Sequence, residues 1–149
     1  MADSIYRVAM ILEKDEPGTH VLLNLCGEIF VRRYETGHNL ADLDKAIFSY
    51  DRSVRLTQDF DSEQGARLAD LGVAVWIRSK RRGGMVDLAR ARFFLEASLL
   101  NETRGVPDRK ANLAGILLQQ FTQTGEVSGL DLAIALLREA VEEENSGRP

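Results

Sequence analysis

Cysteine, proline, aromatic side chains and long apolar runs are all scarce in this chain of 149 residues. The single cysteine, Cys26, excludes an internal disulfide and a thiolate metal cluster, and it favours a reducing compartment. The longest strictly apolar run, residues 73–77, is far shorter than the roughly 18 residues that a membrane span needs. Residues 1–16 carry six charged side chains and therefore lack the apolar centre of a signal peptide. We expect a cytoplasmic protein, with the nucleus as the alternative, and no membrane contact.

Proline occurs only at Pro17, Pro107 and Pro149, so residues 18–106 contain none. Because a proline inside a helix costs roughly 3 kcal/mol, this stretch permits consecutive helices. Apolar residues recur at spacings of three and four, for example through residues 40–54, and no long alternating segment predicts a strand. The predicted fold class is all-α.

A repeat of about 42 to 45 residues runs through the chain. Each copy contains two small residues that are 19 positions apart, and apolar residues flank both of them at helical spacing. Small residues let two helices approach closely, while their apolar neighbours interlock around the contact. The small pairs are Gly27 with Ala46, Gly72 with Ala91, and Ala114 with Ala133.

Each copy predicts a helical hairpin whose two helices carry one small residue each. Glycine-containing segments at 36–39, 82–84 and 124–125 mark the turns between the helices. A half copy comes first, because residues 2–12 match residues 46–56 at a constant offset of 44. About seven helices are therefore expected. The single repeat domain, residues 1–149, divides into a half repeat at 2–16 and full repeats at 19–60, 62–104 and 107–145.

The segment RRYETGHNLADLDKAI, residues 32–47, resembles tetratricopeptide-like (TPR-like) repeats of the long-period type found in tandem in fungal and actinobacterial proteins. Residues 85–99 and 121–141 look like weaker copies of it. The resemblance implies an α-solenoid of antiparallel helix pairs wound as a right-handed superhelix. Such arrays often precede a caspase-like CHAT peptidase domain and are regarded as scaffolds for protein–protein interaction. This chain has no room for a peptidase domain, and its second repeat has lost the Thr-Gly turn.

The resemblance also implies a partner-binding concave groove, at three fixed positions on the first helix of each hairpin. The apolar Val73 and Ile77 at these positions suggest that the groove takes an apolar segment or helix, or that a neighbouring helix covers them. The lysine-and-asparagine pattern of chaperone-tail adaptors is missing. The sole tryptophan, Trp76, stands where other repeats are apolar and is expected in the core. The groove positions are Asn24, Glu28, Arg32, Ala69, Val73, Ile77, Ala111, Gly115 and Gln119.

Charge is distributed unevenly, because a net +3 over residues 62–105 lies between two negative segments in a chain of net charge −4. A basic run at the end of a predicted helix accounts for this. Three interpretations of this run are open. It is a docking patch for an acidic partner or for nucleic acid, a nuclear-targeting segment, or a solvated helix end where cations are favourable. Nucleic-acid binding is the weaker alternative in an acidic chain without interleaved surface aromatics. The run comprises Arg78, Lys80, Arg81 and Arg82.

Cysteine, histidine and aspartate, which often serve in catalysis, do not occur here at spacings typical of an active site. Cys26 with His20 or His38 is the sole cysteine and histidine combination, but Cys26 stands where the other repeats have leucine, which predicts a core residue. Asp42 and Asp44 are two positions apart on a predicted helix and do not share a face. No cluster has metal-ligand spacing. We expect no enzymatic activity, no metal and no cofactor.

Three functions remain as hypotheses. The first is a non-enzymatic scaffold that binds a partner protein through the groove or the exposed ends of the array. The second is a regulatory or structural fragment of a larger CHAT-associated repeat protein, which self-associates through uncapped ends. The third is binding of an acidic partner or nucleic acid by the basic middle repeat.

Overall fold

The computed structural model describes residues 3–4, 6–7, 18–57, 62–100 and 106–146. These residues form α-helices and connecting turns and contain no β-strand, which confirms the all-α prediction. The predicted helix in the half repeat 2–16 lies mostly outside the described residues, although residues 3, 4, 6 and 7 are helical. The remaining described helices are α2 (Thr19–Gly37), α3 (Leu40–Leu56), α4 (Gln64–Arg82), α5 (Met85–Leu99), α6 (Pro107–Thr124) and α7 (Leu130–Ser146).

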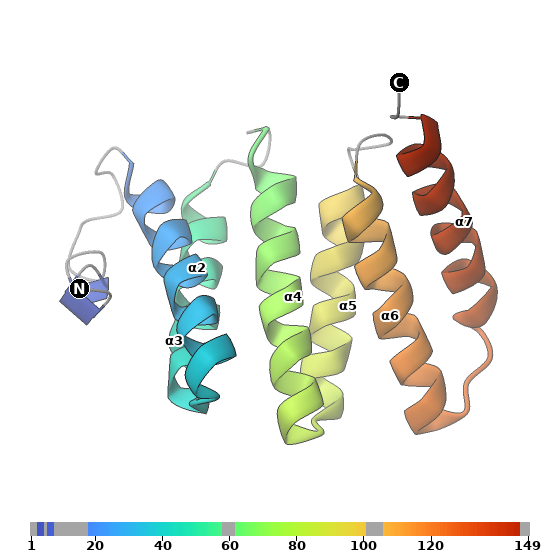
Figure 1. Cartoon of the computed structure of the whole chain (residues 1–149), viewed down its shortest axis with the longest axis horizontal. Coiled ribbons are helices and arrows are strands. Elements are labelled where there is room, and N and C mark those ends of the chain that lie inside the picture. Colours follow the sequence, from blue (N-terminus) through green and yellow to red (C-terminus); the bar gives the residue numbers. More distant parts are fainter. Residues whose placement is uncertain (1–2, 5, 8–17, 58–61, 101–105, 147–149) are drawn as a thin grey trace.

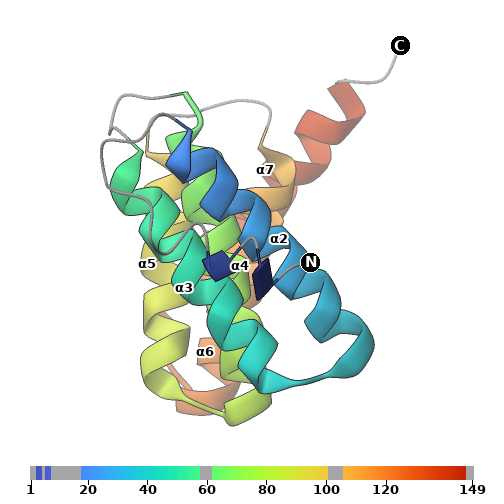
Figure 2. The ribbon, with the colours of Figure 1, turned by 90° about the vertical axis from the view of Figure 1, so that its left-hand side faces the viewer.

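These helices form antiparallel hairpins that lie side by side in chain order (Figure 1). Helix α2 packs on α3, α4 on α5, and α6 on α7, while α3–α4 and α5–α6 contacts join one hairpin to the next. Helices α2, α4 and α6 lie in front of α3 and α5 in Figure 1, and α4 also contacts α6 directly. Figure 2 shows the same stack from its α2 and α3 end. The first helices of the three hairpins therefore share one side of the molecule.

Each turn within a hairpin begins with a residue in the left-handed conformation. Gly83 and Gly125 have φ of 74°, as expected for glycines that end a helix. In the first hairpin, however, the left-handed residue is His38 with φ 56°, rather than the preceding Gly37. Its backbone N–H donates to the Tyr34 carbonyl at 2.7 Å. This bond satisfies an orphan carbonyl of the helix end and offsets the strain of a non-glycine residue there.

The small residues predicted for the helix contacts are required by close approach. A Cβ added at Gly27 would lie 2.4 Å from Cε1 of Tyr50, and one at Gly72 would lie 2.1 Å from Cδ2 of Leu95. Both partners stand four positions after the second small residue of their hairpin. The prediction of glycine-mediated helix packing is confirmed in these two hairpins. The third hairpin has Ala114 at this position.

One continuous apolar core runs through all three hairpins and receives buried side chains from α2 to α7. Its largest fully buried members include Phe30, Leu43, Leu71 and Leu95. Among the described residues, no helix combines the length and the apolar character needed to cross a bilayer. The core occupies the space between the first and second helices of the hairpins.

Candidate functional site

The residues predicted to line a groove all lie on α2, α4 and α6, the helices that share one side of the stack (Figure 1). We call this surface the helix-A face. Glu28, Arg32 and Ala111 are exposed, whereas Ala69 is buried and contributes to the core. The remaining positions are half-buried: Asn24, Val73, Ile77, Gly115 and Gln119.

Exposed apolar side chains that the sequence reasoning missed surround these positions. Val21 and Leu25 on α2 are 54% and 46% exposed. They stand seven residues before Glu28 and Arg32, respectively, and so lie on the same side of the helix as these two residues. Leu118, beside Gln119 on α6, is 40% exposed. The spacing of Val21 and Leu25 could have revealed them. The helix-A face thus combines charge with exposed apolar area at its α2 and α6 edges.

Trp76 joins α4 to α6 on this face. Its indole Nε1 donates to Oε1 of Gln119 at 2.7 Å, and the ring leaves no room for a Cβ at Gly115, which would lie 2.6 Å away. The ammonium of Lys80 lies 4.1 Å from the ring centroid, in cation–π geometry. The expected core packing is therefore only part of its role, since the half-buried ring also fixes the spacing of the two hairpins. Gln119 is engaged in this contact.

The carboxyl group of Asp70 on α4, which interacts with Asn24 and Glu28 on α2, has a raised pKa. Burial raises the pKa of Asp70 to about 6, and the negative charge of Glu28 raises it further. A hydrogen bond from Asn24 and the charges of Arg109 and Arg67 oppose the shift. Asp70 therefore changes its protonation state near neutral pH. Nothing in its sequence spacing signals this, because the shift depends on contacts between helices.

Cys26 and the two histidines each contact other parts of the helical framework. Cys26 is 1% exposed in the core, as predicted, and burial raises the pKa of its thiol. His20 contacts the buried Arg67 through Nδ1, and Ser53 donates to the His20 carbonyl at 2.5 Å. His38 packs against the Tyr34 ring. Within the described residues, no group of three or more histidine, cysteine or acidic side chains is placed to hold a metal ion.

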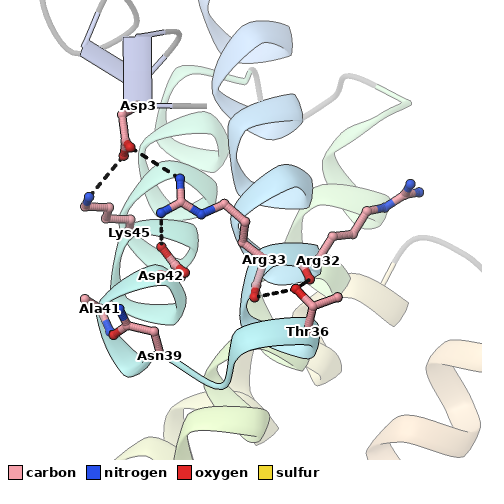
Figure 3. Close-up of polar contacts among 8 residues, drawn as sticks. All are labelled: Asp3, Arg32, Arg33, Thr36, Asn39, Ala41, Asp42 and Lys45. Carbon is pink, nitrogen blue, oxygen red and sulfur yellow. Dashed lines mark hydrogen bonds and ion pairs between the residues drawn. The ribbon is translucent and has the colours of Figure 1, made fainter. Parts of the chain in front are cut away.

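An arginine network ties the first hairpin to the helical segment before it (Figure 3). Arg33 on α2 contacts Asp42 on α3 at 3.0 Å and Asp3 at 3.3 Å, and Lys45 contacts Asp3 at 3.2 Å. The neighbouring Arg32 extends in the opposite direction, away from this network (Figure 3). One of the two adjacent arginines is thus structural, and the other is available on the helix-A face.

The same arrangement recurs in the second hairpin, and it engages half of the predicted basic run. Arg78 on α4 binds both carboxylate oxygens of Asp87 on α5, at 2.7 and 2.8 Å, and reaches Asp44 on α3 at 3.2 Å. Arg82 contacts Asp44 at 2.9 Å. Both Arg78 and Asp87 stand 45 positions after Arg33 and Asp42. This constant offset is the signal that could have revealed the network.

The rest of the basic run divides between a structural contact and solvent. Lys80 lies over Trp76, whereas Arg81 is exposed. The third hairpin has lost the network, because Gln120 stands at the arginine position and accepts from Arg92 of α5 at 3.0 Å. The middle repeat is therefore less positive toward solvent than its sequence suggests. Two of its arginines, Arg78 and Arg82, make ion pairs between helices.

These observations define an all-helical protein built from hairpins that repeat in sequence and in contact pattern. No protein-family model matches the chain, and no curated protein or solved structure matches it.

Proposed function

We propose that this chain is a non-enzymatic TPR-like α-solenoid that binds a partner protein through the helix-A face. The observation that carries the proposal is the combination of exposed apolar Val21, Leu25 and Leu118 with half-buried Val73 and Ile77 on this face. Exposed apolar area bordered by charge is typical of surfaces that bind a helix or an extended apolar segment. The expected partner segment is therefore apolar on one side.

Charged groups at the same face give the proposed interaction its orientation. Glu28 and Arg32 are exposed on α2, one turn apart, and Arg32 points away from the network that engages Arg33 (Figure 3). Charges at the border of an interface contribute more to orientation and association rate than to affinity. The apolar contacts would then supply most of the affinity, and the charges would select among apolar segments.

The resemblance of residues 32–47 to CHAT-associated arrays supports a related proposal, that such a scaffold serves a peptidase-linked system. No further observation favours it over another protein partner. The helix-A face is the part that experiment can address directly.

Affinity capture from the native cell, with matched variants of the protein, tests the helix-A face. Leu25→Glu places a charge on this face, and Phe48→Glu places one on α3, at a residue that is 50% exposed and so close to Leu25 in exposure. We expect Leu25→Glu to lose a partner that the wild type and Phe48→Glu retain. Circular dichroism must show that both variants are folded. Identical partner sets for all three proteins would refute the proposed face.

A further inference from the structure

The side chain of Asn24 on α2 carries a buried oxygen that lacks a hydrogen-bond donor. Its Oδ1 is shielded from solvent, and no described residue donates to it. Nearly all buried polar groups in native proteins have a partner, because an unsatisfied one destabilises the folded state. The amide N–H of the same side chain donates to the carboxyl group of Asp70 on α4. Asp70 is therefore placed to supply the missing donor.

Asp70 differs in its pairing from other aspartates between the helices. Asp42, Asp44 and Asp87 each form an ion pair with an arginine. Asp70, in contrast, forms no ion pair with any residue that the structure describes. A carboxyl group that is partly buried without such a pair is more easily protonated, so the neutral form is accessible to Asp70.

Arg67 does not neutralise Asp70, although it stands three positions earlier on the same side of α4. The arginine is 6% exposed, and its Nη1 donates to Oγ1 of Thr57 at 2.6 Å and contacts Nδ1 of His20. Its charge acts on Asp70 without a hydrogen bond between the two side chains. The hydrogen bond that reaches Asp70 comes from Asn24.

The remaining surroundings of Asp70 come from the other helices. Helix α5 packs on the opposite side of α4, where Gly72 makes its close contact. Tyr50 of α3 is a titratable neighbour, because burial and then the charge of Asp70 raise the pKa of its hydroxyl. The charged groups that act on Asp70 are Glu28 of α2, Arg67 of α4 and Arg109 of α6.

We propose that protonated Asp70 forms a carboxylic acid–amide pair with Asn24, which joins α2 to α4 in a pH-dependent way. The Asp70 O–H donates to Oδ1 of Asn24, while the Asn24 N–H donates to the second oxygen of Asp70. These two hydrogen bonds leave no acceptor of the pair unsatisfied. When the proton passes to solvent, only the bond from Asn24 remains, and the Asp70 carboxylate faces the like charge of Glu28. The junction of the first two hairpins therefore loosens as pH rises.

The pair acts within the helix-A face, because Asn24 and Glu28 are two of its positions. The pKa of Asp70, about 6, places the change close to neutral pH. This regulation goes beyond the proposed partner binding, and its test requires no partner.

Amide hydrogen exchange of the full chain, followed by NMR at about pH 5 and 7.5 and corrected for intrinsic rates, gives the opening constant of α2. Asp70→Asn supplies an N–H to Oδ1 of Asn24 at both pH values, whereas Asp70→Leu removes the charge without replacing the donor. At the higher pH, we expect α2 to open about tenfold less in Asp70→Asn than in Asp70→Leu, which corresponds to about 1.4 kcal/mol. The wild type should approach Asp70→Asn at the lower pH only.

Two control variants isolate the pair. In combination with Asn24→Leu, the two substitutions of Asp70 should no longer differ, because the acceptor is gone. Glu28→Gln should move the transition of the wild type to lower pH, since the charge of Glu28 raises the pKa of Asp70. If Asp70→Leu does not fold, Asp70→Ala takes its place, because it also lacks both charge and donor.

Three results would overturn the proposal. The first is equal opening of α2 in Asp70→Asn and Asp70→Leu while Asn24 is present. The second is a wild-type opening constant that does not change between the two pH values. The third is a pH response that persists in Asp70→Asn and disappears in His20→Asn, which keeps an acceptor for Arg67 but does not titrate. That result would assign the response to His20.

Discussion

Gly27 is the residue whose substitution tests the repeat packing most directly. A Cβ at this position would lie 2.4 to 2.8 Å from three carbons of the Tyr50 ring. Ordinary contact begins near 3.4 Å, so the ring must move by about 1 Å, yet it is only 4% exposed in a packed core. Overpacking of this kind costs about 1–3 kcal/mol, and the rigid ring places Gly27→Ala near the upper limit.

Helix propensity acts in the opposite direction. Alanine is more favourable than glycine inside a helix by about 1 kcal/mol, so Gly27→Ala should destabilise the protein by a net amount of about 2 kcal/mol. Gly37→Ala is the matched control on the same helix, because its Cβ would meet nothing within 4 Å. It should leave the stability unchanged or raise it by up to about 1 kcal/mol.

The assay is urea unfolding followed by far-UV circular dichroism, for both variants and for Gly27→Ala combined with Tyr50→Leu. This double variant carries the residues that the third hairpin has at these two positions, Ala114 and Leu137. Its destabilisation should be smaller than the sum of the two single effects by about 1–2 kcal/mol, because the leucine frees the space that the new Cβ needs. If Gly27→Ala stabilises the protein as much as Gly37→Ala does, the close approach of α2 to the Tyr50 ring is refuted.

Two further predictions concern charged groups. The folded-state pKa of Asp70, about 6, lies above its ordinary value of 3.8. Protonation of Asp70 therefore contributes to the stability of the folded state at low pH, and this contribution is lost as pH rises from about 4 through 6. Because the group is partly exposed, we discount the effect for solvent screening to about 1–2 kcal/mol. Asp70→Asn should stabilise the protein by that amount near pH 7 and reduce the change in its urea midpoint between about pH 4 and 7; an unaltered pH profile would contradict the assignment. Arg78→Met should lower the free energy of unfolding by about 1–3 kcal/mol, because it leaves the half-buried Asp87 carboxylate without its bidentate partner. The pKa of Asp87, which Arg78 lowers, should rise in this variant, as measured by a carboxyl NMR titration. The exposed pair of Arg55 with Asp51 provides the control, where Arg55→Met should change stability by less than about 0.5 kcal/mol; equal effects of the two substitutions would argue against the network.

Periodicity in the sequence was sufficient to predict the features that depend on helix spacing alone. The all-α class, the small residues at Gly27 and Gly72 and the buried Cys26 all follow from the way apolar and small side chains recur. These features need only the knowledge that helices pack on their neighbours. Local rules also predicted the turns, apart from the shift of the left-handed residue from Gly37 to His38.

Features that depend on contacts between hairpins were not predicted. The joining of α4 to α6 by Trp76, and the pKa of Asp70, depend on how far apart adjacent hairpins lie. Repeat spacing does not give that distance. The basic run illustrates the same limit, since sequence alone cannot show that Arg78 and Arg82 face Asp44 on another helix. The predicted groove positions lie on α2, α4 and α6, but their contacts and exposure, such as the burial of Ala69, required the structure.

The loss of the arginine network in the third hairpin makes the joints of the stack unequal. Arg78 and Arg82 join the first hairpin to the second by ion pairs with Asp44, whereas Arg92 of α5 reaches the neutral oxygen of Gln120, which stands at the arginine position of α6. Dissolved salt weakens attraction between exposed opposite charges far more than it weakens bonds to neutral acceptors. Rising ionic strength should therefore loosen the first joint before the second, and amide hydrogen exchange would locate the change. Salt concentration would then change the stability of the junction between the first two hairpins more than that of the junction between the last two.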